Sequence, residues 1–341
     1  MRKGKLTQAA LSRSVLRVLE KRREDVVISP AYGCSCGIFH GCAGTEDENE
    51  SESGQLTVTA CGSSAGFPTE APECAVREAC GHLLAAGAEP VGITVNLLLP
   101  ETFEESRLKT LIRRLDNEAG AYGAAILGGH TEVSGQVLCP VVSVTAVGKA
   151  KELPLLPDPE MDLVAVGTIA ATAAGMLARE QREHLKGHFS EGFLCDAAEM
   201  AGTRVLPAAV KVLKEKGRYP MKAVFRGGIF AALWEMAEHA GIGLDVELKR
   251  IPIRQETIEL CEYFSLNPYQ LFCTDMLLVA ATDGAQLVRE LARHQIPAMV
   301  IGRTTAGKER VLRNGEEVRY LDKPQTDEWY RMEEQAEHFA G

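Results

Sequence analysis

A proline-rich segment near the middle of the chain constrains the fold more than any other feature. It reads Leu153-Pro154-Leu155-Leu156-Pro157-Asp158-Pro159. Each proline removes a backbone N–H donor and fixes φ, so neither a helix nor a central strand continues through this segment. The chain has 341 residues, which is more than one typical domain contains. We therefore predict two domains, residues 1–152 and 160–322, followed by a charged tail at residues 323–341.

The composition is that of a globular protein, with 45% apolar and 25% charged residues. A formal net charge of -10 argues against nucleic acid and against an anionic membrane as partners, because both attract a basic surface. The sequence contains no apolar run of 18 residues and no secretory signal at its start, so we expect a cytoplasmic protein. In that compartment the ten cysteines are expected to be reduced thiols.

Hydrophobic periodicity predicts alternating strands and helices in both halves. In the first half the expected strands are 56–59, 91–99 and 137–147, and the expected helices are 7–22, 74–86 and 103–120. In the second half the expected strands are 163–166, 276–280 and 298–301, a small-residue turn is expected at 167–175, and the expected helices are 196–214, 228–240, 255–264 and 284–294. The run 91–99 is apolar enough to be a strand buried on both faces.

Several short motifs occur in a fixed order along the chain. They are Gly81-His82 with Gly87-Ala88-Glu89-Pro90, Gly128-Gly129-His130-Thr131, Gly227-Gly228 and Asn267-Pro268. In these motifs and their spacing the chain resembles the aminoimidazole ribonucleotide synthetase superfamily, and within it the HypE-like hydrogenase-maturation factors. The resemblance implies an α/β (α+β) fold in two parts, an N-terminal mixed sheet with helices and a C-terminal α/β sandwich. It also implies a homodimer joined through the N-terminal sheets.

Members of that superfamily hold Mg²⁺ and ATP with aspartates and glutamates in these motifs. At the matching positions this chain has Ser35, Gly62, His82, His130, Ala223 and Arg226. Mg²⁺ requires oxygen ligands, and phosphoryl transfer depends on charge stabilisation. With these residues in place of the family's carboxylates, we expect Mg-ATP to bind weakly or not at all. The glycines of the phosphate loops are retained at Gly128, Gly129, Gly227 and Gly228, where tight turns explain them as well as phosphate contact does.

Cysteine and histidine are gathered at the same motifs. Cys34, Cys36 and Cys61 lie at or beside two of the family's metal-binding turns, and His82 and His130 occupy two others. Sulfur and imidazole nitrogen are ligands for Zn²⁺ or another soft metal. If the family's backbone is retained, these five residues should share one pocket. The alternative is that the cysteines are small buried side chains without a metal, since their spacing matches no standard zinc or cluster signature.

Three functions remain open at this point. The first is a non-catalytic scaffold or partner, for example of another maturation protein, in hydrogenase or other metalloenzyme maturation. The second is an ATP-dependent HypE-type enzyme with an altered metal site. The third is a soft-metal or redox-binding protein. HypE also uses a cysteine at its C-terminus, whereas the last cysteine here is Cys273.

Overall fold

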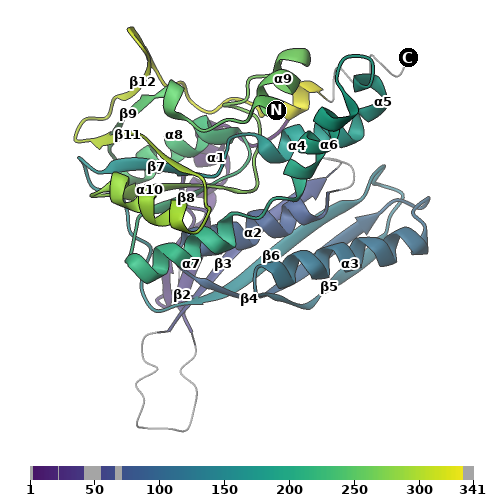
Figure 1. Cartoon of the computed structure of the whole chain (residues 1–341). Helices are drawn as coiled ribbons and strands as arrows, with labels where there is room; N and C mark the ends of the chain where they lie inside the picture. Colours follow the sequence, from purple (N-terminus) through teal and green to yellow (C-terminus); the bar gives the residue numbers. More distant parts are fainter. Residues whose placement is uncertain (1–2, 22, 42–54, 66–70, 333–341) are drawn as a thin grey trace. The chain divides into compact units, whose positions relative to one another are not determined.

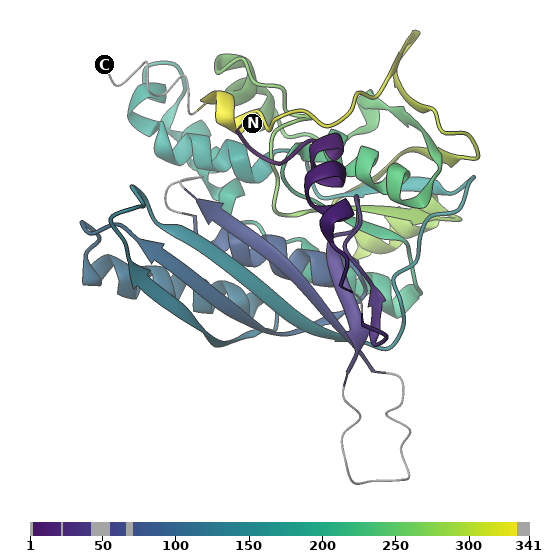
Figure 2. The same cartoon turned by 180° about the vertical axis from the view of Figure 1, so that it is seen from behind.

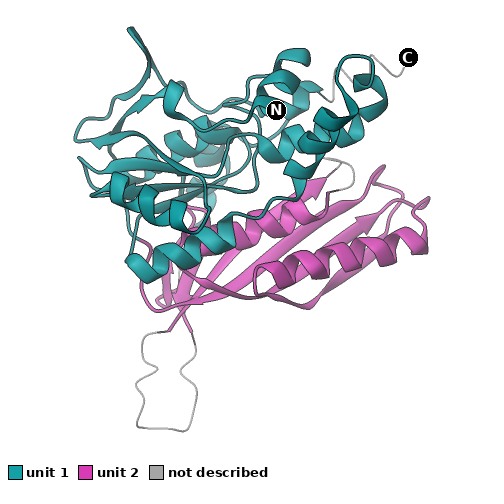
Figure 3. Cartoon of the chain, viewed as in Figure 1, with its two compact units in different colours: residues 1–19, 31–33, 155–341 teal, residues 20–30, 34–154 magenta. Residues whose placement is uncertain are grey.

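The computed structural model describes residues 3–21, 23–41, 55–65 and 71–332 (Figures 1 and 2). The chain forms two compact units, coloured separately in Figure 3. Unit 1 consists of Met1–Leu19, Ala31–Gly33 and Leu155–Gly341, and unit 2 consists of Glu20–Pro30 and Cys34–Pro154. The chain passes from unit 2 to unit 1 between Pro154 and Leu155, inside the proline-rich segment. The beginning of the chain, which we expected in the first domain, groups instead with the later half.

Unit 2 is built on a six-stranded sheet in the order β1-β2-β3-β6-β4-β5. All neighbouring strands are antiparallel except β4 and β5, which are parallel. The elements are β1 (Val26–Ile28), β2 (Cys36–His40), β3 (Leu56–Ala65), α2 (Glu73–Ala85), β4 (Glu89–Leu99), α3 (Glu105–Ala121), β5 (Ala125–Val133) and β6 (Val141–Ala150). Strand β5 contains the Gly128-Gly129 motif and was not predicted.

One face of this sheet is covered by α2 and α3, and no described helix of unit 2 covers the other face (Figures 1 and 2). Burial alternates along β4 accordingly: Val95 and Leu97 are buried beneath the helices, whereas Thr94 and Asn96 are exposed. Within the chain β4 is therefore buried on one face only, which differs from the two-sided burial that its sequence predicted. We call the uncovered face of this sheet the open face.

Two arginine–glutamate pairs join α2 to α3. Arg114 on α3 binds Glu73 on α2 through both carboxylate oxygens, at 2.5 and 2.8 Å. One helical turn further along both helices, Arg77 on α2 binds Glu118 on α3, with Nε 2.9 Å from Oε1. The arginine is on α3 in the first pair and on α2 in the second. Both pairs form only when the two helices have this one alignment, so a shift of one helix along the other would break both.

Unit 1 contains a seven-stranded sheet in the order β13-β12-β9-β11-β7-β10-β8, with β12 and β9 as its parallel pair. Its strands are β7 (Asp162–Val166), β8 (Met221–Val224), β9 (Gly243–Glu247), β10 (Met276–Ala281), β11 (Ala298–Thr305), β12 (Arg310–Asn314) and β13 (Glu317–Tyr320). Its α-helices are α1 (Gln8–Ser14), α4 (Ala171–Glu180), α5 (Arg182–Leu185), α6 (Glu191–Glu199), α7 (Leu206–Lys216), α8 (Gly228–Ala240), α9 (Gln255–Tyr263) and α10 (Gly284–Arg293). Short 3₁₀ turns η1 (Leu16–Val18), η2 (Met200–Gly202) and η3 (Leu248–Arg250) complete it.

Three sequence predictions for unit 1 need correction. The helix expected at 196–214 is two helices, α6 and α7, separated at Thr203, because the Asp275 carboxylate accepts the N–H groups of Val205 and Leu206 and starts a new helix there. The small-residue turn expected at 167–175 is a turn only up to Ala170, after which α4 begins. The helix expected at 7–22 is the much shorter α1 followed by η1.

The N-terminal segment packs on α8 through polar contacts. Gln8 donates to Glu238 at 2.7 Å and accepts from the indole N–H of Trp234 at 3.3 Å. Lys5 forms an ion pair with Glu235, which also binds Lys222 at 2.9 Å. These contacts explain why the start of the chain belongs to unit 1. Among the helices that the structure describes, none is long and apolar enough to cross a membrane.

Candidate functional site

Cys36 lies near the carbonyl of His82 on the covered side of the unit 2 sheet, and Cys34 contacts Cys36. Cys36 is paired with Ala60, whose side chain is buried beneath α2, and its thiol donates to the His82 carbonyl at a sulfur–oxygen distance of 3.3 Å. The Cys34 thiol donates to the Cys36 carbonyl at 3.2 Å. Both thiols therefore form hydrogen bonds to backbone carbonyls.

Cys61 lies on the opposite side of the same sheet. Its neighbour Gly62 faces α2 so closely that a Cβ there would be 2.2 Å from the Ala75 carbonyl oxygen. Because side chains alternate along a strand, Cys61 faces the open face, where its sulfur is 3.6 Å from the Thr145 hydroxyl. The sheet thus separates Cys61 from His82.

His130 is on the open face as well, but at the far edge of the sheet. Its side chain is 67% exposed and its Nε2 lies 3.3 Å from a carboxylate oxygen of Glu132. Strands β6 and β4 lie between β3, which carries Cys61, and β5, which carries His130. Three strand spacings separate the two residues by about 14 Å or more.

The structure does not bring the five predicted metal ligands into one pocket. Cys34, Cys36 and the backbone of His82 are close together, whereas Cys61 and His130 are each elsewhere. In the described part of the chain, no three His, Cys, Asp or Glu side chains are grouped so that they could hold a metal ion. The nine cysteines within that part form no disulfide.

The fold itself requires glycine at three of the four retained positions, Gly129, Gly227 and Gly228. A Cβ on Gly129 would lie 1.9 Å from the Val95 carbonyl oxygen, and one on Gly228 would lie 2.5 Å from the Tyr269 carbonyl oxygen. Gly227 and Gly228 also have φ values of 82° and 64°, in the left-handed region that favours glycine. Only Gly128 has open space around its Cβ position. At the other three positions the fold alone accounts for glycine.

The Asp327 carboxylate accepts a hydrogen bond from the backbone N–H of Gly227. The carboxylate accepts N–H groups from Gly227 at 2.5 Å, from Trp329 at 3.0 Å and from Phe272 at 3.3 Å. Burial raises the pKa of Asp327 to about 6, although these backbone donors and Arg226 favour the ionised form. The amide that would face a phosphate in a glycine-rich loop thus already holds a carboxylate of the same chain.

Asp327 was not among the predicted site residues, because residues 323–341 were predicted to be a charged tail. Trp329 and Met332 in that tail are each 3% exposed, so its first part is packed into unit 1. Two large apolar side chains within a charged stretch were the available signal. Residues 333–341 of the predicted tail lie outside the described residues.

The next residues stand at positions where the superfamily that this chain resembles has acidic side chains. Here they are enclosed by neighbouring groups or are in contact with them. Gly62 has no room for a side chain beneath α2, and Ala223 on β8 is 2% exposed in the core. Beside Ala223, Lys222 binds Glu235, and the two lysines around Glu235 lower its pKa to about 2 despite its burial. The Arg226 guanidinium contacts the Tyr330 hydroxyl at 3.3 Å.

The chain matches two domains of one protein family. Residues 58–150 match the AIR synthase related protein, N-terminal domain, and residues 158–313 match the AIR synthase related protein, C-terminal domain. It is 29% identical to the carbamoyl dehydratase HypE of Rhodobacter capsulatus over 239 residues, which cover 67% of this chain and 68% of that protein.

The fold is also similar to that of solved HypE structures. A HypE–HypF complex is matched with a TM-score of 0.67 at 20% identity, over 79% of this chain and 90% of the solved chain. HypE in complex with ATP is matched with a TM-score of 0.67 at 17% identity, over 80% and 86% of the two chains. The predicted two-part α/β fold and the predicted resemblance are both confirmed: the chain belongs to the AIR synthase related family and has the fold of its HypE-like members.

Proposed function

We propose that this protein is a non-catalytic scaffold or partner in the maturation of hydrogenase or another metalloenzyme. Two contacts within the chain carry the proposal. The Asp327 carboxylate binds the Gly227 amide, and α2 leaves no space for a carboxylate at Gly62. Phosphoryl transfer is catalysed mainly by positioning and by charge stabilisation from metal ions held on carboxylates. The similarity to HypE supplies the maturation context.

Calorimetric titration with ATP in the presence of Mg²⁺ tests the non-catalytic part of the proposal. We expect no saturable heat at micromolar ATP. A matched titration with EDTA in place of Mg²⁺ is the control. A micromolar dissociation constant that depends on Mg²⁺ would overturn the scaffold proposal and favour the second candidate, an ATP-dependent enzyme, which the likeness to ATP-bound HypE supports.

The scaffold proposal also requires a protein partner. The solved HypE–HypF complex makes a HypF-type maturation protein from the same source the first partner to test. We expect a stable complex of the two purified proteins in size-exclusion chromatography. We also propose that the two proteins meet in the cytoplasm. Failure of purified maturation proteins to bind would count against the maturation context while leaving the ATP result unaffected.

We further propose that the protein is a homodimer joined through the open face of unit 2. That face carries exposed Thr94 and Asn96 on β4, in line with Thr145 and Ser143 on β6. Small polar side chains of this kind allow two sheets to approach closely. Light scattering of Asn96→Arg should show a smaller mass than the native chain, whereas Arg113→Glu on the exposed side of α3 should not. A native chain that is monomeric at micromolar concentration would refute the dimer.

A further inference from the structure

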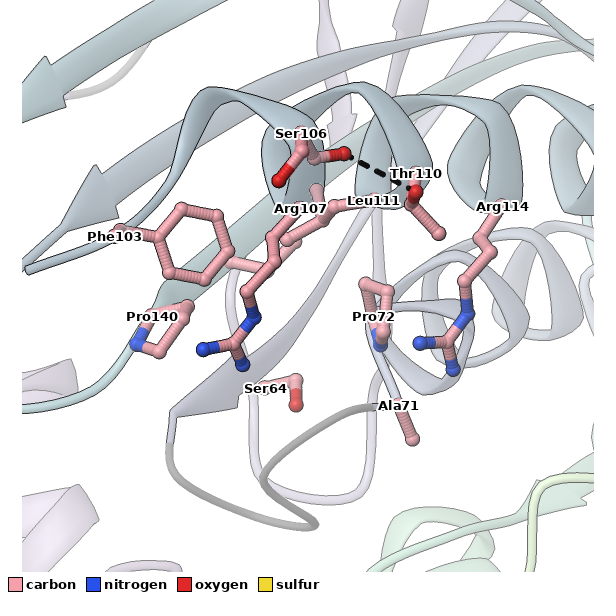
Figure 4. A pocket seen from close by; sticks show the side chains of 11 residues that line it. Ser64, Ala71, Pro72, Phe103, Ser106, Arg107, Thr110, Leu111, Arg114 and Pro140 are labelled. Atoms are coloured by element: carbon pink, nitrogen blue, oxygen red, sulfur yellow. Dashed lines mark hydrogen bonds between the residues drawn. The ribbon is translucent and has the colours of Figure 1, made fainter.

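Two pockets of the described residues differ in whether their cations are already bound to a carboxylate. The larger pocket, of about 250 Å³, lies in unit 2 against α3, and Arg107 and Arg114 are among its lining residues (Figure 4). Arg114 donates from Nε and Nη2 to the Glu73 carboxylate, at 2.5 and 2.8 Å. An anion entering this pocket would compete with a carboxylate that is already in place. We therefore assign no anion site there.

The second pocket lies within unit 1 and has a volume of about 70 Å³. It is bounded by the start of α8, the loop that follows α9, and residues 319–325 at the end of β13. Buried Phe230, Leu312 and Leu321 form its apolar base. An engineered cavity of about 150 Å³ holds benzene, so this pocket has room for a group about half that size. A carboxylate with a methyl-sized substituent is such a group.

Arg319 supplies the principal charge of this pocket. It lies opposite Leu312 in the pairing of β13 with β12, and because opposite residues share a face, its side chain is on the same side of the sheet as the buried leucine. Its guanidinium lies over the Phe230 ring, 5.8 Å from the centroid. Within the described residues this guanidinium forms no hydrogen bond and no ion pair. Its N–H donors are therefore available to a ligand.

The net charge of the lining residues is that of one cation. Arg319 and Lys323 are positive and Asp322 is negative, and the other lining residues are uncharged. Lys323 also acts electrostatically on Glu238, whose carboxylate binds Gln8 and Arg310. A ligand with a single negative charge would balance this lining. Arg319 and Lys323 are both exposed, so such a ligand can reach them from solvent.

Side-chain amides provide further donors. The Oδ1 atom of Asn267 accepts the N–H of Tyr269 at 3.1 Å, which leaves its NH2 group as a donor. The Gln270 side chain forms no hydrogen bond to another described residue, and both amides line the pocket. Gly227 lines it as well, but its N–H is bound to Asp327 and is not available. The pocket thus combines one unpaired guanidinium with two neutral amide donors.

We propose that this pocket binds a small carboxylate monoanion, with the carboxylate against Arg319 and with Asn267 and Gln270 as additional donors. The planar guanidinium fork matches the two oxygens of a carboxylate. A phosphate dianion carries one charge more than the lining balances, and it is tetrahedral and bulkier. This ligand class goes beyond the scaffold role proposed above and does not depend on it.

Acetate is the probe, titrated into the full chain with EDTA present and followed by saturation-transfer NMR of its methyl protons. We expect saturable binding with a dissociation constant of about 1 mM, which is within reach of a ligand with four heavy atoms. Arg319→Ala should weaken it about tenfold or more through loss of a charge-assisted hydrogen bond, and Arg319→Lys should weaken it less. Gln270→Ala should have a smaller effect than Arg319→Ala.

Two controls separate a specific site from general attraction to basic side chains. Arg289→Ala removes an exposed arginine of α10 that does not line the pocket, and it should leave acetate binding unchanged. Acetamide has nearly the shape of acetate without its charge, and it should bind at least tenfold more weakly. Circular dichroism of each variant establishes that it is folded.

Three outcomes would overturn the proposal. An absence of saturation at ten times the expected dissociation constant would show that the pocket has no such ligand. An equal loss of affinity in Arg289→Ala and Arg319→Ala would show that binding is non-specific. Acetamide or inorganic phosphate binding more tightly than acetate would show that the pocket selects another class of ligand. Since the titrations contain neither ATP nor Mg²⁺, their result is independent of the test of the scaffold role.

Discussion

The buried pair between Arg77 and Glu118 allows the sharpest test of how unit 2 is held together. The two side chains are 5% and 0% exposed, and each comes from a different helix. Burial alone would lower the pKa of Arg77, but the adjacent Glu118 carboxylate raises it above its ordinary value, so the arginine is charged. The substitution Glu118→Gln keeps the size of the side chain and removes the charge that compensates Arg77.

The expected cost follows from the burial of the remaining charge. Removing one partner of a buried ion pair typically destabilises a protein by about 3–5 kcal/mol, because the other charge stays in a medium of low dielectric. The amide oxygen of Gln can still accept one hydrogen bond, so we expect about 3 kcal/mol. The double variant Arg77→Met with Glu118→Leu removes both charges and should recover most of that loss, since apolar replacements of buried pairs are often neutral or stabilising.

Hydrogen exchange of α2 and α3, followed by mass spectrometry, measures this free energy locally. A local readout is needed because the chain has two units and a global transition would mix them. The control is Glu105→Gln, which breaks the exposed pair with Lys109 on the same helix and should cost about 0.5 kcal/mol or less. If Glu118→Gln costs no more than this control, or if the double variant is less stable than the single one, the reasoning is refuted.

Other variants test unit 1 and the packing of glycines. The folded-state pKa of Asp327, about 6, lies above the usual value of about 3.9. The docked segment 326–332 should therefore lose stability as pH rises from about 4 to 6. In Asp327→Asn, the hydrogen-exchange protection of this segment should no longer depend on pH in that range. Gly62→Ala should destabilise unit 2 by about 1–3 kcal/mol by overpacking, whereas Gly120→Ala on α3, where a Cβ meets nothing within 4 Å, should stabilise it by about 0.5–1 kcal/mol, as read from the same exchange experiment. Asp275→Ala should cost about 0.5–2 kcal/mol by removing the N-terminal cap of α7, seen as faster exchange at its first turn.

Elements with strong periodicity were predictable from the sequence. Helix α8 was predicted with the bounds that it has, since its apolar residues follow a helical period and glycines flank it. Strand β5 was missed because Gly128 and Gly129 weaken the strand pattern, and its place is set by its pairing with β4, which local sequence does not report. The start of α7 depends on Asp275, which is about 70 residues away in the sequence, so no local signal marks it.

For the candidate site, the same contrast between local pattern and tertiary packing applies. The separation of Cys61 from Cys36 and His82 follows from the period-two alternation of β3, given that Ala60 and Gly62 face α2. The sequence contained that alternation, but only the structure shows which face α2 covers. Proximity along a motif was therefore a poor guide to proximity in space, because neighbouring strand residues point in opposite directions.

The glycine motifs and the acidic positions carry different information about function. Gly129 and Gly228 are needed wherever a carbonyl oxygen approaches so closely, so their presence says nothing about a bound phosphate. Gly62 is the more informative position, because α2 lies where a side chain would have to be. Restoring a carboxylate there would require α2 to move away from β3, which would disturb the two ion pairs that fix α2 against α3. The residue at position 62 is thus fixed by the packing of α2 against β3.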